Sequence, residues 1–309
     1  MRRALRLWSC FWGEKHLDLF EKALVQSLSW PINRQALAGA KWDIWTLEKE
    51  FPYVADIAKK VSIDIELNAA DSFLERLPTE YLNDSGVMIN QMLIKSIRRC
   101  IDTESQMLIA PPDTIFGGDS IPNILQAGED PGSVVFVAHM RVVPSILGEI
   151  DERGKSNWVL CDTALRFAHR SWVEAEAGKE RSNSFVGGIY WQRRPNGVIA
   201  VRHRLPTPYL INWQSKDYDW FARPTPQGEW PAVMGEIDHA WPGAWLFQEE
   251  RARVIGSSDD AFICEVTDPE SNVPPLMNYS KDEPDKFWRG AFHNKINRAF
   301  QITFRGVQS

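Results

Sequence analysis

The first half of the chain alternates short apolar runs with longer segments of helical periodicity. One stripe of a predicted amphipathic helix carries Leu17, Phe20, Leu24 and Leu28. Helices are predicted at residues 14–28, 48–60 and 85–100. Strands are predicted at residues 5–10, 42–46, 63–67, 107–110 and 133–138. Because strands alternate with helices, we expect βαβ units and a mainly parallel sheet.

The pattern changes after about residue 145. A helix is predicted at residues 162–177, and a hairpin is predicted from two strands at 185–191 and 197–203. Proline and tryptophan then interrupt the chain as far as Trp245, and the last predicted elements are a strand at 263–266 and a helix and strand within 287–304. We therefore expect an α/β fold whose central sheet is flanked by helices, with an irregular second half.

The amino-acid composition excludes several broad classes of protein. The 309 residues are 44% hydrophobic and 25% charged, as in ordinary globular proteins. The net charge of −6 argues against a protein whose whole surface binds nucleic acid, while a local basic patch at residues 193–204 stays open. The four cysteines are far apart, which favours a reducing compartment. Without a secretory signal or about 18 consecutive apolar residues, the sequence predicts a cytoplasmic location and no membrane span.

The most informative local pattern lies at residues 106–120. An apolar run ends at Asp113, and Gly117-Gly118 follow within a few residues. A strand of this kind delivers a carboxylate to the carboxyl edge of a sheet, where open α/β sheets bind their ligands. A carboxylate there could hold a divalent cation and, through it, a diphosphate. The alternative is that Asp113 only opens the turn before the glycines.

Two acidic clusters occur in the second half. Glu236, Asp238 and His239 lie together, and an extended chain would place both carboxylates on one face. A carboxylate there could deprotonate a hydroxyl, and the imidazole could bind a metal. The alternative is a solvated polar loop. Asp259 and Asp260 precede an apolar run, where they either contact an acceptor or form an Asx turn.

No G-x-G-x-x-G, Walker A, H-E-x-x-H or G-x-S-x-G motif is present. However, residues 4–145 resemble the GT-A type glycosyltransferases in the order of their strands and helices. These enzymes use nucleotide-diphospho-sugar donors and carry a D-x-D motif after the fourth strand. Here the phrase Leu-Ile-Ala-Pro-Pro-Asp-Thr-Ile-Phe at residues 108–116 resembles that motif, with Pro111 in place of the first acid and Asp113 as the second.

The resemblance implies transfer of a sugar from a nucleotide-diphosphate donor to a glycan or other hydroxyl acceptor. Residues 1–145 would bind the donor and residues 146–309 the acceptor, within one continuous domain. Mg²⁺ or Mn²⁺ would bind Asp113 and His239, and Asp238, or else Glu236, would be the general base. The donor would contact Phe11, Trp12, Gly13, Thr46, Lys95 and Arg99. The acceptor side would include Trp241, Trp245, Asp259 and Asp260.

Two alternatives stay open at this stage. One is a non-enzymatic carbohydrate-binding or assembly protein on a degenerate transferase scaffold, which fits the Pro111-Pro112 replacement and the tryptophan-rich second half. The other is a glycoside hydrolase with paired carboxylates among Glu236, Asp238, Asp259 and Asp260. A hydrolase would act without a nucleotide and without a metal.

Overall fold

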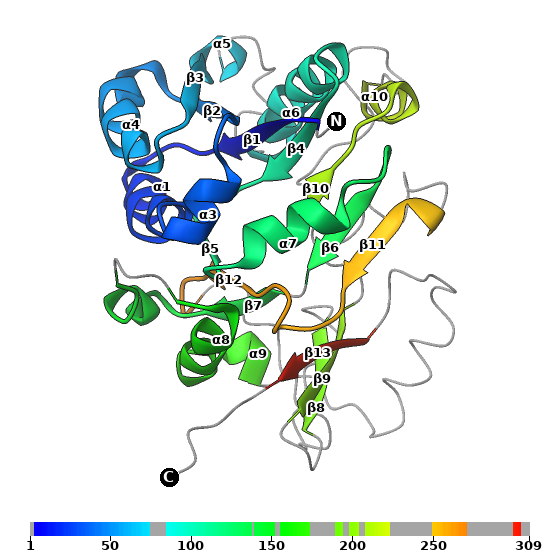
Figure 1. The fold of residues 1–309 in the computed structure, drawn as a ribbon. Coiled ribbons are helices and arrows are strands. Elements are labelled where there is room, and N and C mark those ends of the chain that lie inside the picture. Colours follow the sequence, from blue (N-terminus) through cyan, green and yellow to red (C-terminus); the bar gives the residue numbers. More distant parts are fainter. Residues whose placement is uncertain are drawn as a thin grey trace.

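The structure is a computed structural model that describes residues 3–74, 85–137, 139–151, 155–173, 189–193, 198–203, 208–222, 249–270 and 299–303. Its centre is a seven-stranded sheet in the order β11-β6-β10-β4-β1-β2-β3 (Figure 1). The strands are β1 Ala4–Cys10, β2 Lys41–Thr46, β3 Asp64–Ala69, β4 Ser105–Ile109, β6 Val134–Val137, β10 Pro208–Ile211 and β11 Ala252–Ile255. Only β10 runs antiparallel to its neighbours in this sheet, so the expected mainly parallel α/β sheet is confirmed.

Helices cover both faces of the central sheet. On one face the helical segments are α1 Glu14–Leu19, the π-helical η1 Phe20–Val25, α2 Gln26–Leu28, α3 Pro31–Ala36, η2 Glu48–Glu50, α4 Phe51–Ala58, η3 Lys59–Val61 and α7 Ser120–Ala127. On the other face are α5 Asp71–Leu74, α6 Ser85–Asp102 and α10 Ser215–Ala222. Figure 1 shows α7 in front of β6 and β10, and α6 behind β1 and β4. The helices predicted at 14–28, 48–60 and 85–100 are confirmed.

Strand alternation divides the core into two apolar layers. Leu7 of β1 joins a layer under the first set of helices, whereas Trp8 joins a layer under α6. The same division holds along β4, where Leu108 faces one layer and Met107 the other. Both faces of these strands are buried, which explains why they are near-continuous apolar runs in the sequence.

A second sheet stands beyond the carboxyl edge of the first. It contains β5 Thr114–Phe116, β12 Ile263–Val266 and β7 His139–Val142, with β12 antiparallel to β5 and parallel to β7. A third apolar cluster packs this sheet against α8 Asn157–Arg166 and α9 Arg170–Val173. Short 3-10 segments lie at η5 Pro144–Gly148 and η6 Glu249–Arg251. A third sheet has the strands β8 Ile189–Arg193, β9 Val198–His203 and β13 Ala299–Thr303.

The structure corrects two expectations for the second half. Over residues 162–173, the single helix predicted at 162–177 is replaced by the end of α8 and by α9, because Ala168 forms a β-bridge with Val142 between them, and residues 174–177 lie outside the described residues. The stretch around Pro208 was expected to be irregular, but it forms β10 in the middle of the central sheet. Proline is tolerated as the first residue of a strand, so Pro208 begins β10 without interrupting it. No helix in the described ranges has the length and apolarity needed to cross a membrane.

Candidate functional site at the carboxyl edge of the sheet

Asp113 lies just past the carboxyl end of β4, next to β1. From β1 the strand order proceeds to β2 and β3 on one side and to β4 on the other, so the order reverses between β1 and β4. Ligands of open α/β sheets bind in the crevice at such a reversal. Asp113 is partly exposed, and its carbonyl oxygen accepts a hydrogen bond from the Val266 amide at 2.8 Å. The structure therefore places Asp113 where the apolar run predicted it, while its role stays a prediction.

Glu50 ties the ends of β1 and β2 together beside this edge. One carboxylate oxygen accepts from the Gly13 amide at 2.9 Å, and the other accepts from the Thr46 hydroxyl at 2.5 Å and the Leu47 amide at 3.4 Å. Gly13 has a φ of 86°, a left-handed conformation that favours glycine. The predicted donor residues Gly13 and Thr46 are thus brought together by a buried carboxylate that the sequence analysis did not single out.

Of the two aromatic residues after β1, only Trp12 is partly accessible. Phe11 is 3% exposed, and its ring stacks on Phe20 at a centroid distance of 4.6 Å. Trp12 packs at the edge of the opposite apolar layer. The Phe11 side chain therefore belongs to the core, and Trp12 is the member of the pair that is placed to meet a ligand.

A polar cluster that the sequence analysis missed lies between the central sheet and the second sheet. This junction cluster contains Asp113, His139, Arg141, Tyr209 and Glu265. The Glu265 carboxylate lies 3.4 Å from His139 Nε2 and 3.2 Å from Arg141 Nε. The Tyr209 and His139 rings have centroids 6.4 Å apart. The side chain of His139 is only 2% exposed, whereas that of Glu265 is 25% exposed, so Glu265 is the member of this pair that can touch a substrate.

Burial shapes the electrostatics of the junction cluster. It raises the pKa of Tyr209 well above 10, and the nearby negative charges of Glu265 and Asp113 raise it further. The phenol therefore keeps its proton and can donate a hydrogen bond. The pairing of β5 with β12 brings the two segments together, since Glu265 is the register partner of Thr114, the residue after Asp113, although 152 positions separate Asp113 from Glu265 (265 minus 113).

The sequence does contain a weak signal for this cluster. His139 and Arg141 alternate with apolar residues directly after an apolar run, and Glu265 interrupts the apolar segment 263–266. Alternation in a strand places the side chains of residues i and i+2 on one face. A polar residue at a buried strand position is informative only when its partner strand is known, and β7 and β12 become partners only in the fold.

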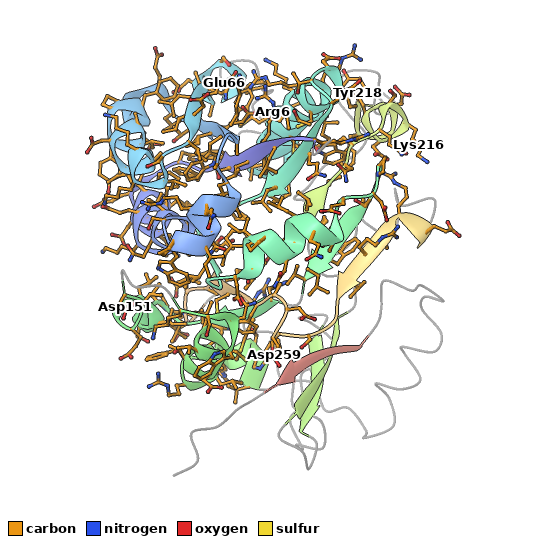
Figure 2. The ribbon with its side chains drawn as sticks, viewed as in Figure 1. Arg6, Glu66, Asp151, Lys216, Tyr218 and Asp259 are labelled. Atoms are coloured by element: carbon orange, nitrogen blue, oxygen red, sulfur yellow. The ribbon has the colours of Figure 1, made fainter. Side chains whose placement is uncertain are left out.

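Asp259 and Asp260 occupy a turn at the other end of the paired strands β5 and β12. The Asp260 amide donates to the Ser257 carbonyl at 3.1 Å, and Asn157 Nδ2 donates to the carbonyls of Asp259 and Asp260. In Figure 2, Asp259 lies in the part of the molecule that holds α8. This geometry fits the turn interpretation, and the structure does not bring these two acids together with Asp113.

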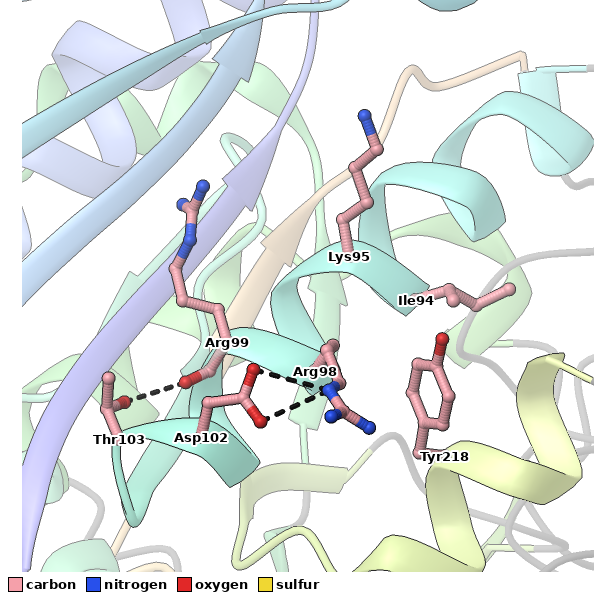
Figure 3. Close-up of a pocket in the computed structure, with 7 residues that line it drawn as sticks. All are labelled: Ile94, Lys95, Arg98, Arg99, Asp102, Thr103 and Tyr218. Atoms are coloured by element: carbon pink, nitrogen blue, oxygen red, sulfur yellow. Dashed lines mark hydrogen bonds and ion pairs between the residues drawn. The ribbon is translucent and has the colours of Figure 1, made fainter.

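Lys95 and Arg99 lie on α6, below one face of the sheet. Arg99 pairs with Glu66 at 2.8 Å and with Asp43 at 3.4 Å, and Lys95 Nζ lies 4.3 Å from the centre of the Phe73 ring. Both side chains line a hollow of about 390 Å³ between α6 and α10 (Figure 3). Their expected contact with the donor stays a prediction.

The described residues do not form a metal centre on their own. In the ranges that the structure covers, no three His, Cys, Asp or Glu side chains are grouped so that they could hold an ion. Glu265 is also engaged by Arg141 and His139. The remaining predicted site residues lie outside the described residues, namely Glu236, Asp238, His239, Trp241 and Trp245.

No protein-family model matches the chain, and no curated protein matches its sequence. Among solved structures, it is similar to S. aureus TarS at 10% identity and a TM-score of 0.29, over 45% of this chain and 22% of that one. Mouse xyloside xylosyltransferase 1 matches at 9% identity and a TM-score of 0.31, over 45% and 52%.

A putative glucose-1-phosphate thymidylyltransferase from Bacillus anthracis matches at 13% identity and a TM-score of 0.28, over 46% of this chain and 57% of that one. The chain thus spans less than two thirds of each of these neighbours. At such low TM-scores the likeness carries no argument about function, which depends on the site itself.

Proposed function

We propose that the protein transfers a sugar from a nucleotide-diphosphate donor to a hydroxyl acceptor. The observation that supports the proposal best is the placement of Asp113 at the carboxyl end of β4, at the reversal of strand order beside β1. Trp12, Gly13 and Thr46 border the same edge, and the Glu50 carboxylate accepts hydrogen bonds from both Gly13 and Thr46. This arrangement supplies an aromatic surface for a base and a carboxylate near the position that a diphosphate would take.

Asp113 and a diphosphate are both negatively charged, so a cation must lie between them. Mg²⁺ or Mn²⁺ would neutralise charge on the departing nucleotide diphosphate. Since the described residues form no complete metal site, we propose that Asp113 shares the ion with donor oxygens and with His239. Arg141 lies in the same junction cluster and offers a second positive charge.

The acceptor side needs a group that accepts a proton from the attacking hydroxyl. Asp238, or else Glu236, stays the predicted base. Glu265 is a competitor, because its carboxylate is partly exposed and its backbone pairs with Thr114, the residue after Asp113. His139 and Arg141 would act as positioning residues, since they restrain the Glu265 carboxylate from the buried side.

The proposal predicts nucleotide-dependent stabilisation. Thermal unfolding with a panel of nucleoside diphosphates, with and without Mn²⁺, should show one nucleotide that raises the Tm by about 5 °C at about 100 times its Kd. Asp113→Asn should remove the Mn²⁺-dependent part of the rise. Asp56→Asn is a matched control, because Asp56 is exposed on α4 and forms a surface ion pair with Lys59.

Two results would count against the transferase. If no nucleotide shifts the Tm while a glycan does, the carbohydrate-binding alternative becomes the better conclusion. If a nucleotide stabilises wild type and Asp113→Asn equally at every Mn²⁺ concentration, the carboxyl end of β4 does not hold the diphosphate.

A further inference from the structure

We propose that the hollow between α6 and α10 is a second binding site, separate from the Asp113 edge, for a small molecule that carries a phosphate group. Its volume of about 390 Å³ suits a small ligand. α6 supplies most of the lining, and Tyr218 of α10 supplies the opposite wall. Figure 3 shows Lys95 and Arg99 extending from α6 on the same side, with Arg98 beside the Tyr218 ring.

The charge of the hollow is opposite to that of the protein. Lys95, Arg98 and Arg99 are three and four positions apart, so they share one side of α6. Asp102 is the one acid among the described residues of the lining, and it pairs with Arg98 at 3.1 Å. Three cations and one anion therefore line the hollow, and Glu66 and Asp43 lie behind it as the partners of Arg99.

Among the lining residues, Lys95 gives the strongest support for an anionic ligand. Its ammonium lies 4.3 Å from the centre of the Phe73 ring and 6.0 Å from that of Trp45. Rings orient a cation without neutralising its charge. Within the described ranges, no carboxylate lies at ion-pair distance from Lys95. The ammonium is therefore held in place, exposed, and able to donate to a phosphate.

The two arginines complete the recognition of a phosphate. The Arg98 guanidinium lies 5.5 Å from the Tyr218 ring, and Arg99 is held by Glu66 and Asp43. Arginine donors are ordered in this way before a ligand arrives, which lowers the entropy lost on binding. A planar guanidinium group can donate two parallel hydrogen bonds to the oxygens of one phosphate. Arg98 is suited to this because it pairs with Asp102 through Nε, whereas the terminal nitrogens of Arg99 contact Glu66, Asp43 and Asn68, so that Arg99 contributes mainly its charge.

Asp102 and Thr103 form the end of the hollow that lies at the amino end of β4, whereas Lys95 lies beside Trp45, near the carboxyl end of β2. α6 ends at Asp102, and Thr103 and Glu104 lead directly into the amino end of β4, while Asp113 follows its carboxyl end. The five residues of β4 span about 16 Å. A single phosphate cannot contact both ends. A phosphate beside Arg98 and Thr103 is therefore distinct from the proposed donor diphosphate at Asp113.

Calorimetric titration with inorganic pyrophosphate at low salt tests the proposal. Wild type should bind, and Lys95→Met should bind about tenfold more weakly, because it loses one charge-assisted contact but keeps the apolar stem on Phe73. Arg98→Met should show a similar loss. Lys59→Met, which removes another exposed lysine on a different helical segment, and Asp113→Asn should both bind like wild type, with folding checked by circular dichroism.

Three results would overturn the second site. The first is a wild-type protein that does not bind pyrophosphate, and the second is a Lys59→Met variant whose binding is weakened as much as that of Lys95→Met. The third is loss of binding in Asp113→Asn, which would place pyrophosphate at the β4 edge, either alone or in one continuous donor site with Lys95. The first two results do not bear on whether a nucleotide binds at Asp113, and the third would support binding there, so failure of the second site is distinguishable from failure of the proposed function.

Discussion

At the residue scale, four charged side chains lie between α6 and the central sheet, where the surrounding layer is otherwise apolar. They are Arg6, Asp43, Glu66 and Arg99. The Arg6 and Asp43 side chains are 9% and 1% exposed, and they pair at 2.8 Å. Burial raises the pKa of Asp43, and Arg6 and Arg99 oppose that rise. Figure 2 shows Arg6 and Glu66 in the same region of the molecule. The four charges depend on one another, so removing one leaves the others poorly compensated.

Asp43→Ala should lower the free energy of unfolding by about 3 kcal/mol, because Arg6 would stay buried with only the more distant Glu66 as a partner. Urea unfolding followed by tryptophan fluorescence measures the change. Asp56→Ala, on an exposed surface, should cost less than about 0.5 kcal/mol. The double variant Arg6→Met with Asp43→Leu should recover most of the loss. An Asp43→Ala variant as stable as wild type would mean that the pair is not buried in solution.

Tyr209 should make stability depend on alkaline pH. Its folded pKa lies well above its ordinary value of 10, so the folded protein keeps the proton that the unfolded chain releases. The stabilising contribution is therefore complete below pH 10 and is lost as the pH rises above it.

Unfolding of wild type and Tyr209→Phe by urea, at a series of pH values from 8 to about 11, tests this expectation. The stability difference between the two proteins should shift in favour of Tyr209→Phe as the pH passes 10. Parallel pH profiles would show that the Tyr209 phenol is not buried beside Asp113 and Glu265.

At the element scale, the turn between β5 and α7 depends on its two glycines. A Cβ atom on Gly118 would lie 2.7 Å from the Lys155 carbonyl oxygen, and one on Gly117 would lie 2.0 Å from Asn157 Oδ1. Asp119 accepts a hydrogen bond from the Asn157 amide at 3.0 Å, which fixes the start of α8 against this turn. Gly117-Gly118 thus allow two loops to approach closely, a role that local sequence does not reveal.

Gly118→Ala should cost about 2 kcal/mol of unfolding free energy, because its new methyl group meets backbone that cannot rotate away. Gly148→Ala is the matched control and should be neutral, since a methyl group added there would have no described atom within 4 Å. Urea unfolding of the two variants side by side gives the comparison. Equal stabilities would show that the 155–157 loop packs less closely on the turn.

The elements that the sequence predicted well are those whose burial is regular. The helix at 14–28 carries a clean apolar stripe, and the strands β1, β2 and β4 are apolar runs buried on both faces. The predicted single helix after residue 162 was wrong because the β-bridge at Ala168 is a contact between distant segments. The strand β10 was missed for a related reason, since its place is set by β4 and β6 rather than by its own short sequence.

At the scale of the whole molecule, the candidate site also depends on contacts between segments that are distant in the sequence, which sequence patterns do not reveal. Asp113 was identifiable because one short window holds both its strand and its turn. The junction cluster was not, because Asp113, His139, Tyr209 and Glu265 come from four segments that meet only when two sheets have formed. Glu50 was missed because its partners belong to two different strand ends, with Gly13 after β1 and Thr46 as the last residue of β2.

The position of β10 affects how the chain folds during its synthesis. β4 and β6 are not hydrogen-bonded to each other, and the strand that joins them is the segment Pro208–Ile211. During synthesis, β4 and β6 are therefore complete by residue 137, while the edge of each that pairs with β10 is still unpaired. Unpaired edges of this kind invite association with other chains. A nascent chain that stalls before residue 211 should be a client for chaperones, whereas one that passes it can complete its sheet.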